Sequence, residues 1–307
     1  MNLNTIGKSF RMVEDVFSGK RITNLILTIL SPILFLLASG IPATLINILI
    51  GFTIFNINPF LKSNAENTNF NLISMIINTG FVILAVFLWV KFYEKRNLKT
   101  LGFYKKNAFN KYLIGFFFGF LMLALSALII VITCDVEITP GTLTFSRMFP
   151  FLLVILAWLI QGASEEILLR GFMLPILSKR FGIWTGILGN SIIFAALHLL
   201  NPGIAPLAIL NLILFGIFAS LYTIYSGSLW GACALHSAWN FTQGNIFGFL
   251  VSGTHASGDI VMFINYKSNN LINGGTFGPE GGLTVSLLLI LASILLIKLI
   301  KKNESNK

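Results

Sequence analysis

Long, uncharged apolar stretches recur along this chain and limit the folds that it can adopt. One of them, from Ile22 to Asn58, has no charged residue at all. A run of about 20 apolar residues can cross a lipid bilayer as an α-helix, and only helices and closed barrels satisfy their backbone groups there. The stretches lack the alternation of apolar and polar residues that barrel strands require. The sequence therefore predicts an all-α, polytopic membrane protein.

About eight transmembrane helices are expected, packed in one bundle that forms a single transmembrane domain over residues 1–307. Only 10% of the residues are charged, whereas a soluble domain carries about 25%. The segment 251–282 is rich in Gly and Asn and is predicted to be an extracytoplasmic loop. The predicted spans are 24–52, 70–90, 112–133, 149–173, 184–200, 206–225, 229–250 and 283–299.

Basic residues alternate between the connecting segments and orient the helices. They are frequent before the first span, between the second and third, after the fourth and after the eighth. The intervening loops carry only three basic residues, Lys62, Arg147 and Lys267. Because basic residues gather on the cytoplasmic side, both termini are predicted to be cytoplasmic in a multi-pass protein of the cell membrane. The net charge of +10 is therefore explained by the basic residues that orient the helices. The lipid bilayer is an expected partner, and nucleic acid is not.

Two adjacent carboxylates, Glu165 and Glu166, lie within the fourth predicted span. Charged side chains inside a bilayer are energetically unfavourable, so they usually face a polar cavity or a substrate path. Together with Arg170, they are the charged residues well within the apolar runs. Two of the three histidines, His198 and His236, also lie in predicted spans. These side chains are therefore the candidates for function.

Helical spacing gives these side chains directions. Glu166 and Arg170 are four residues apart, so they share a helix face and are expected to form a structural ion pair. Glu165 points about 100° away and is predicted to have no partner on its own helix. His236 and Asn240 again share a face. If these helices meet, a carboxylate and an imidazole can deprotonate water while an imidazole and an amide stabilise an oxyanion. Those are the groups of a hydrolase.

Three short motifs in this region resemble those of a known family. EEILLR at 165–170 matches the pattern Glu-Glu-x-x-x-Arg, FAALH at 194–198 matches Phe-x-x-x-His, and HSAWN at 236–240 matches His-x-x-x-Asn. Occurring in this order, each in a predicted span, they resemble the CAAX prenyl protease 2 and bacteriocin-processing (CPBP, or Abi) intramembrane proteases. The resemblance places a catalytic core at about 150–250.

What the resemblance implies is an intramembrane endopeptidase of the glutamic type that cleaves a membrane-bound protein or peptide. It implies a site made of Glu165, Glu166, His198, His236 and Asn240. Glu165 and His198 would activate water, and His236 and Asn240 would support the oxyanion. Neither a cofactor nor a metal is expected.

Two alternatives remain open at this point. Two histidines and a glutamate form a known catalytic zinc-ligand set, so a zinc-dependent protease that uses Glu165, His198 and His236 is the alternative mechanism. The other alternative is a non-proteolytic membrane partner or an immunity protein. The two cysteines, Cys134 and Cys233, provide neither a disulfide framework nor a Cys-x-x-Cys zinc site.

The predicted boundaries leave the depth of His198 unresolved. At ~1.5 Å per residue, Glu165 lies about 12 Å and Asn240 about 16 Å from the cytoplasmic ends of their spans. His198 lies about 21 Å from the cytoplasmic end of the fifth span. These groups can meet only if the fifth span begins later or if tilt and kinks at glycines close the gap.

Overall fold

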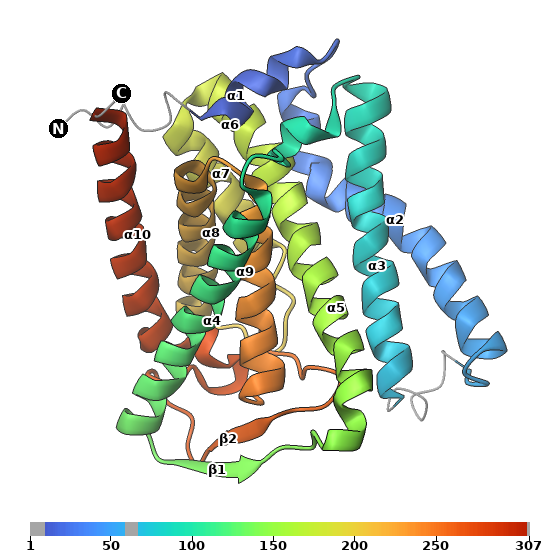
Figure 1. Ribbon diagram of the computed structural model, residues 1–307, viewed down its shortest axis with the longest axis vertical. Coiled ribbons are helices and arrows are strands. Elements are labelled where there is room, and N and C mark those ends of the chain that lie inside the picture. The colour runs from blue at the N-terminus through green and yellow to red at the C-terminus, as the bar shows by residue number, and fades with distance from the viewer. Residues whose placement is uncertain (1–9, 59–66, 306–307) are drawn as a thin grey trace.

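The computed structural model describes residues 10–58 and 67–305, and a helix lies at each of the eight predicted positions (Figure 1). Lys8, Lys62 and Lys307, which contributed to the charge pattern, lie outside these ranges. The α-helices are α1 (Arg11–Asp15), α2 (Leu25–Thr53), α3 (Thr68–Leu88), α4 (Ala108–Thr133), α5 (Met148–Glu166), α6 (Leu174–Phe181), α7 (Ile183–Ala196), α8 (Pro206–Ser226), α9 (Leu229–Phe241) and α10 (Leu283–Ser305).

The fold class is confirmed as an all-α, polytopic membrane protein. Over the described residues, six helical segments are long and apolar enough to cross a membrane, and α7 is a shorter apolar helix. The count of eight spans stays a prediction. One small departure from an all-α chain is an antiparallel pair of strands, β1 (Val136–Pro140) and β2 (Met262–Tyr266), in which Val136 faces Tyr266. The strand β2 belongs to the predicted loop 251–282.

The short helix α9 is the centre of the bundle, although its length alone would not identify it as a spanning helix. The residues from Gly231 to Asn240 are all buried. Helix α4 packs closely against α9 at Gly115 and Gly119. A Cβ atom at Gly115 would clash with the carbonyl oxygen of Gly231, and one at Gly119 with that of Leu235. Small residues one turn apart allow such close backbone approach between membrane helices. This packing holds His236 and Asn240 in the interior.

The fourth span is longer than the sequence predicts, and this resolves the depth of His198. Helix α5 continues through a π-helical segment, Ile167–Met173, into α6, so the helical chain ends at Phe181 and not at residue 173. The turn into α7 is made at Gly182, whose φ of 90° suits glycine. About 25 Å of helix, at ~1.5 Å per residue, separates Gly182 from Glu165 on one side and from His198 on the other. Both can therefore reach the same depth.

The arrangement in Figure 1 leads to a topology prediction. Helix α1 and the carboxyl end of α10 lie at one end of the bundle, and the β1–β2 pair lies at the other. With cytoplasmic termini, reporter fusions at residue 100 should read as cytoplasmic, and fusions at residues 140 and 265 as extracytoplasmic. Since β1 pairs with β2, the last two reporters must agree. A cytoplasmic signal at residue 265 would contradict the predicted orientation.

Candidate active site

A cavity of about 400 Å³ opens in the middle of the bundle, between α2 and α3 on one side and α5, α7 and α9 on the other. Four of the predicted site residues line it: Glu165 from α5, His198 from the turn after α7, and His236 and Asn240 from α9. Residues that are far apart in the sequence thus share one cavity. The other wall is largely apolar and includes Leu36, Met75 and Val82.

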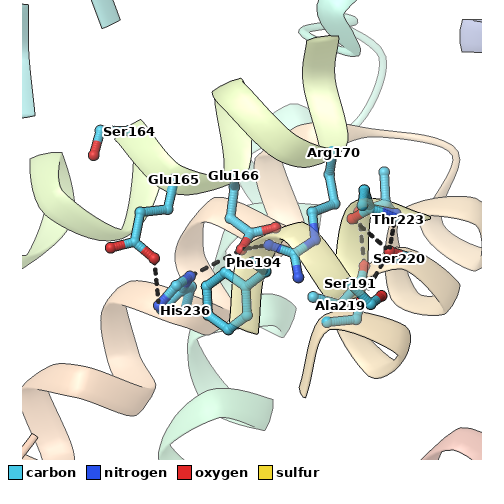
Figure 2. A network of polar contacts seen from close by, with 12 residues as sticks. Ser164, Glu165, Glu166, Arg170, Ser191, Phe194, Ala219, Ser220, Thr223 and His236 are labelled. Atoms are coloured by element: carbon cyan, nitrogen blue, oxygen red, sulfur yellow. Dashed lines mark hydrogen bonds and ion pairs between the residues drawn. The ribbon is translucent and has the colours of Figure 1, made fainter. Parts of the chain in front are cut away.

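Glu166 and Arg170 lie behind this cavity as a fully buried pair. Arg170 Nη1 donates to Glu166 Oε1 over 2.8 Å, and both side chains have no exposed surface. The same oxygen accepts from Nδ1 of His236, also over 2.8 Å. Figure 2 shows Glu166 between the imidazole and the guanidinium. The predicted ion pair is therefore present, and Glu166 also orients His236.

Glu165 lines the cavity, and its two carboxylate oxygens differ in their contacts. Its Oε2 atom lies 3.8 Å from Nε2 of His236 and has no hydrogen-bond partner among the described residues (Figure 2). Its Oε1 atom accepts a hydrogen bond of 2.6 Å from Nε2 of Gln161. The prediction that Glu165 has no partner on its own helix is therefore wrong, because Gln161 lies one turn earlier on the same face of α5.

His198 is oriented by its own helix end. Its Nδ1 lies 2.8 Å from the carbonyl oxygen of Phe194. A carbonyl oxygen only accepts, so Nδ1 carries the proton, and in the neutral ring Nε2 keeps its lone pair. The Phe194 ring packs between the two histidines, 4.7 Å from the His198 ring and 6.0 Å from the His236 ring. His198 thus offers a basic nitrogen at the cavity.

Gln161 is a site residue that the sequence reasoning missed. Besides donating to Glu165, its Oε1 atom accepts a hydrogen bond of 2.8 Å from Nδ2 of Asn240 on α9. Gln161 also lines the cavity. A signal for it exists in the sequence, because a polar residue four positions before Glu165 within an apolar span must share its helix face.

A second carboxylate, Glu280, lines the cavity from the loop 251–282. It is buried and accepts from Trp239 Nε1 at 3.2 Å, from Gln243 Nε2 at 3.1 Å and from the backbone nitrogen and hydroxyl of Ser252 at 2.7 and 2.9 Å. The loop therefore folds back onto the bundle and contributes to the lining of the cavity. Nothing in the sequence pattern indicated this, since Glu280 lies outside every predicted span.

The metal-binding alternative requires ligands that converge on one point. Throughout residues 10–58 and 67–305, no group of three or more His, Cys, Asp or Glu side chains is placed to hold a metal ion. Glu165, His198 and His236 line one cavity but do not form such a group.

Comparison with known proteins addresses the family directly. Residues 147–242 match the family model described as Rce1-like, type II CAAX prenyl endopeptidase. No curated protein and no solved structure matches the chain. The matched segment runs from the start of α5 to the end of α9 and contains all three motifs. Residues 147–242 of this multi-pass membrane protein are thus similar to the CAAX prenyl endopeptidase family, and this match supports the CPBP resemblance that the motifs predicted.

Proposed function

We propose that this protein is an intramembrane glutamic-type endopeptidase, which hydrolyses a peptide bond in a membrane-associated protein or peptide precursor. The observation that carries the proposal is the shared cavity, in which a carboxylate, two imidazoles and a carboxamide from α5, α7 and α9 line one space. These groups supply a general base and oxyanion donors at the same place. The family match supports a protease and leaves the mechanism as our proposal.

The proposed reaction begins with water bound between Glu165 and His198. Glu165 Oε2 has no hydrogen-bond partner among the described residues. It takes a proton from the water while the water oxygen attacks the carbonyl carbon of the substrate peptide bond. Nε2 of His198 accepts the second water hydrogen in a hydrogen bond and so orients the nucleophile. The carbonyl oxygen becomes an oxyanion.

His236 and Asn240 stabilise that oxyanion in the proposed scheme. When both imidazole nitrogens carry protons, His236 donates Nδ1–H to Glu166 and presents Nε2–H to the cavity. Asn240 offers the N–H that Gln161 does not use. Collapse of the intermediate breaks the C–N bond, and Glu165 returns its proton to the leaving nitrogen. The products are a carboxylic acid and an amine, and the enzyme is regenerated.

The cavity also suggests what kind of substrate enters. Its polar groups lie opposite aliphatic side chains of α2 and α3, among them Leu36, Met75 and Val82. An apolar wall inside a membrane protein favours a substrate segment that is itself membrane-associated. The test is to incubate the purified protein in detergent with a quenched peptide library. Internal cleavage supports the proposal, whereas a folded protein that cleaves nothing would favour the non-proteolytic alternative.

A further prediction separates the two enzyme mechanisms. We expect cleavage to survive strong chelators, because a carboxylate and an imidazole can activate water without a Lewis acid, and Asn240 is a hydrogen-bond donor rather than a good zinc ligand. Elemental analysis of the purified protein should find no stoichiometric zinc. About one zinc per chain, with activity lost on chelation and restored by zinc, would establish the metalloprotease instead.

A further inference from the structure

We propose that Gln161 is a positioning residue of this site, which fixes the orientations of both Glu165 and Asn240. The inference rests on the proposed function and deepens it. Gln161 lies outside the three motifs, yet its amide joins the proposed base on α5 to a proposed oxyanion donor on α9. It links these groups through two hydrogen bonds of 2.6 and 2.8 Å.

The backbone packing places Gln161 within reach of both helices. The next residue, Gly162, packs against Ser237 of α9, and a Cβ atom there would lie 2.6 Å from the backbone nitrogen and hydroxyl oxygen of Ser237. Glycine therefore allows α5 and α9 to approach closely at this level. One turn further along α9 is Asn240, which meets the Gln161 amide.

The directions of both hydrogen bonds are those that Glu165 requires in its proposed role as base, in which its carboxylate is ionised. An ionised carboxylate only accepts hydrogen bonds, so Gln161 must turn its NH₂ group toward Glu165. Its carbonyl oxygen then faces Asn240, which must in turn present its own NH₂ group. One charged group thus sets the orientation of two amides in a row. Reversing either amide would bring two acceptors or two donors together.

This chain of bonds has a consequence for each of its ends. At Glu165, Oε1 is held by Gln161, while Oε2 lies on the His236 side, 3.8 Å from Nε2. At Asn240, one N–H is used by Gln161 and the other remains for the oxyanion. Because these effects concern the reacting groups and not substrate contacts, the loss of Gln161 should lower kcat with little change in KM.

The test compares Gln161→Met with the wild type. Methionine keeps an unbranched side chain of similar length but has no amide. We expect kcat to fall by about 10²-fold, the size of effect that misplaced catalytic groups produce, with KM changed less than about threefold. The matched control is Asn78→Leu, because the Asn78 amide also joins two helices, accepting from Asn47 Nδ2 over 3.0 Å, but does not line the cavity. Its kcat should stay near the wild-type value.

An infrared measurement tests the contact itself without any substrate. The carboxylate band of Glu165 is identified as the band lost in Glu165→Gln. It should shift in Gln161→Met, because a hydrogen bond to Oε1 is removed, and should not shift in Asn78→Leu. An unshifted band in Gln161→Met would overturn the inference.

The outcomes distinguish this inference from the proposed function. If the wild type cleaves, Glu165→Gln does not, and Gln161→Met has the wild-type kcat, only the role of Gln161 is refuted. If the folded wild type cleaves nothing, the proposed function fails, and the catalytic role of Gln161 fails with it. Should Gln161→Met not fold, Gln161→Leu is the second variant. Leucine has no hydrogen-bonding group, so the kcat of this variant must also fall, and a wild-type kcat refutes the inference.

Discussion

Replacement of Glu165 by Gln is expected to lower the rate of peptide-bond cleavage by about 10²- to 10⁴-fold, the usual contribution of a general base. Glutamine keeps the size of the side chain but cannot take a proton from water. The side chain is partly exposed to the cavity and its Oε2 atom has no hydrogen-bond partner in the described part of the chain. The protein should therefore remain folded while the chemical step is lost.

The matched control for this prediction is Glu137→Gln. Glu137 is an exposed residue of β1 and does not line the cavity, so the same chemical change there should leave the cleavage rate unaltered. Both variants are compared by initial rates on one peptide and by their elution and thermal unfolding in the same detergent. Cleavage by Glu165→Gln at the wild-type rate would show that Glu165 is not the base.

Replacement of Glu166 by Gln should instead be the change that most reduces stability. Glu166 and Arg170 have no exposed surface, and Glu166 Oε1 also accepts from His236. Removing one partner of a buried pair leaves the other charge uncompensated, which typically costs about 3–5 kcal/mol. Glu165→Gln strands no buried cation, so its loss of stability should be clearly smaller.

Thermal unfolding of the two variants in one detergent measures this difference. The double variant Glu166→Gln/Arg170→Met is the informative control, because it removes the stranded guanidinium and should recover part of the lost stability. An equal loss of stability in Glu165→Gln and Glu166→Gln would contradict the structural role of the buried pair. So would a double variant less stable than Glu166→Gln alone.

Much of the site could be predicted from the sequence because membranes make polar residues conspicuous. Charged and imidazole groups in apolar spans have few structural uses, so Glu165, His198 and His236 stand out in the sequence alone. The spacing of four residues also predicted the ion pair between Glu166 and Arg170, which the structure contains. The catalytic roles of these residues remain predictions.

The features that sequence reasoning missed depend on tertiary contacts. The length of the fourth helix was underestimated because its continuation through the π-helical segment into α6 carries Lys179 and Arg180, which are typical of a loop. Glu280 reaches the cavity because the loop 251–282 folds back onto the bundle, where Trp239, Gln243 and Ser252 donate hydrogen bonds to it. Gln161 was overlooked because a neutral amide is less conspicuous in an apolar span than a charge.

The most direct test of the central claim is to identify cleavage products made by the purified protein in lipid nanodiscs. Wild type and Glu165→Gln are incubated with the same peptide library in water enriched in ¹⁸O, and the products are analysed by mass spectrometry. We expect the wild type alone to produce internal fragments whose new carboxyl termini carry ¹⁸O from the attacking water. Absence of such fragments from folded wild-type protein, or their equal formation by Glu165→Gln, would contradict an endopeptidase that uses Glu165 to activate water.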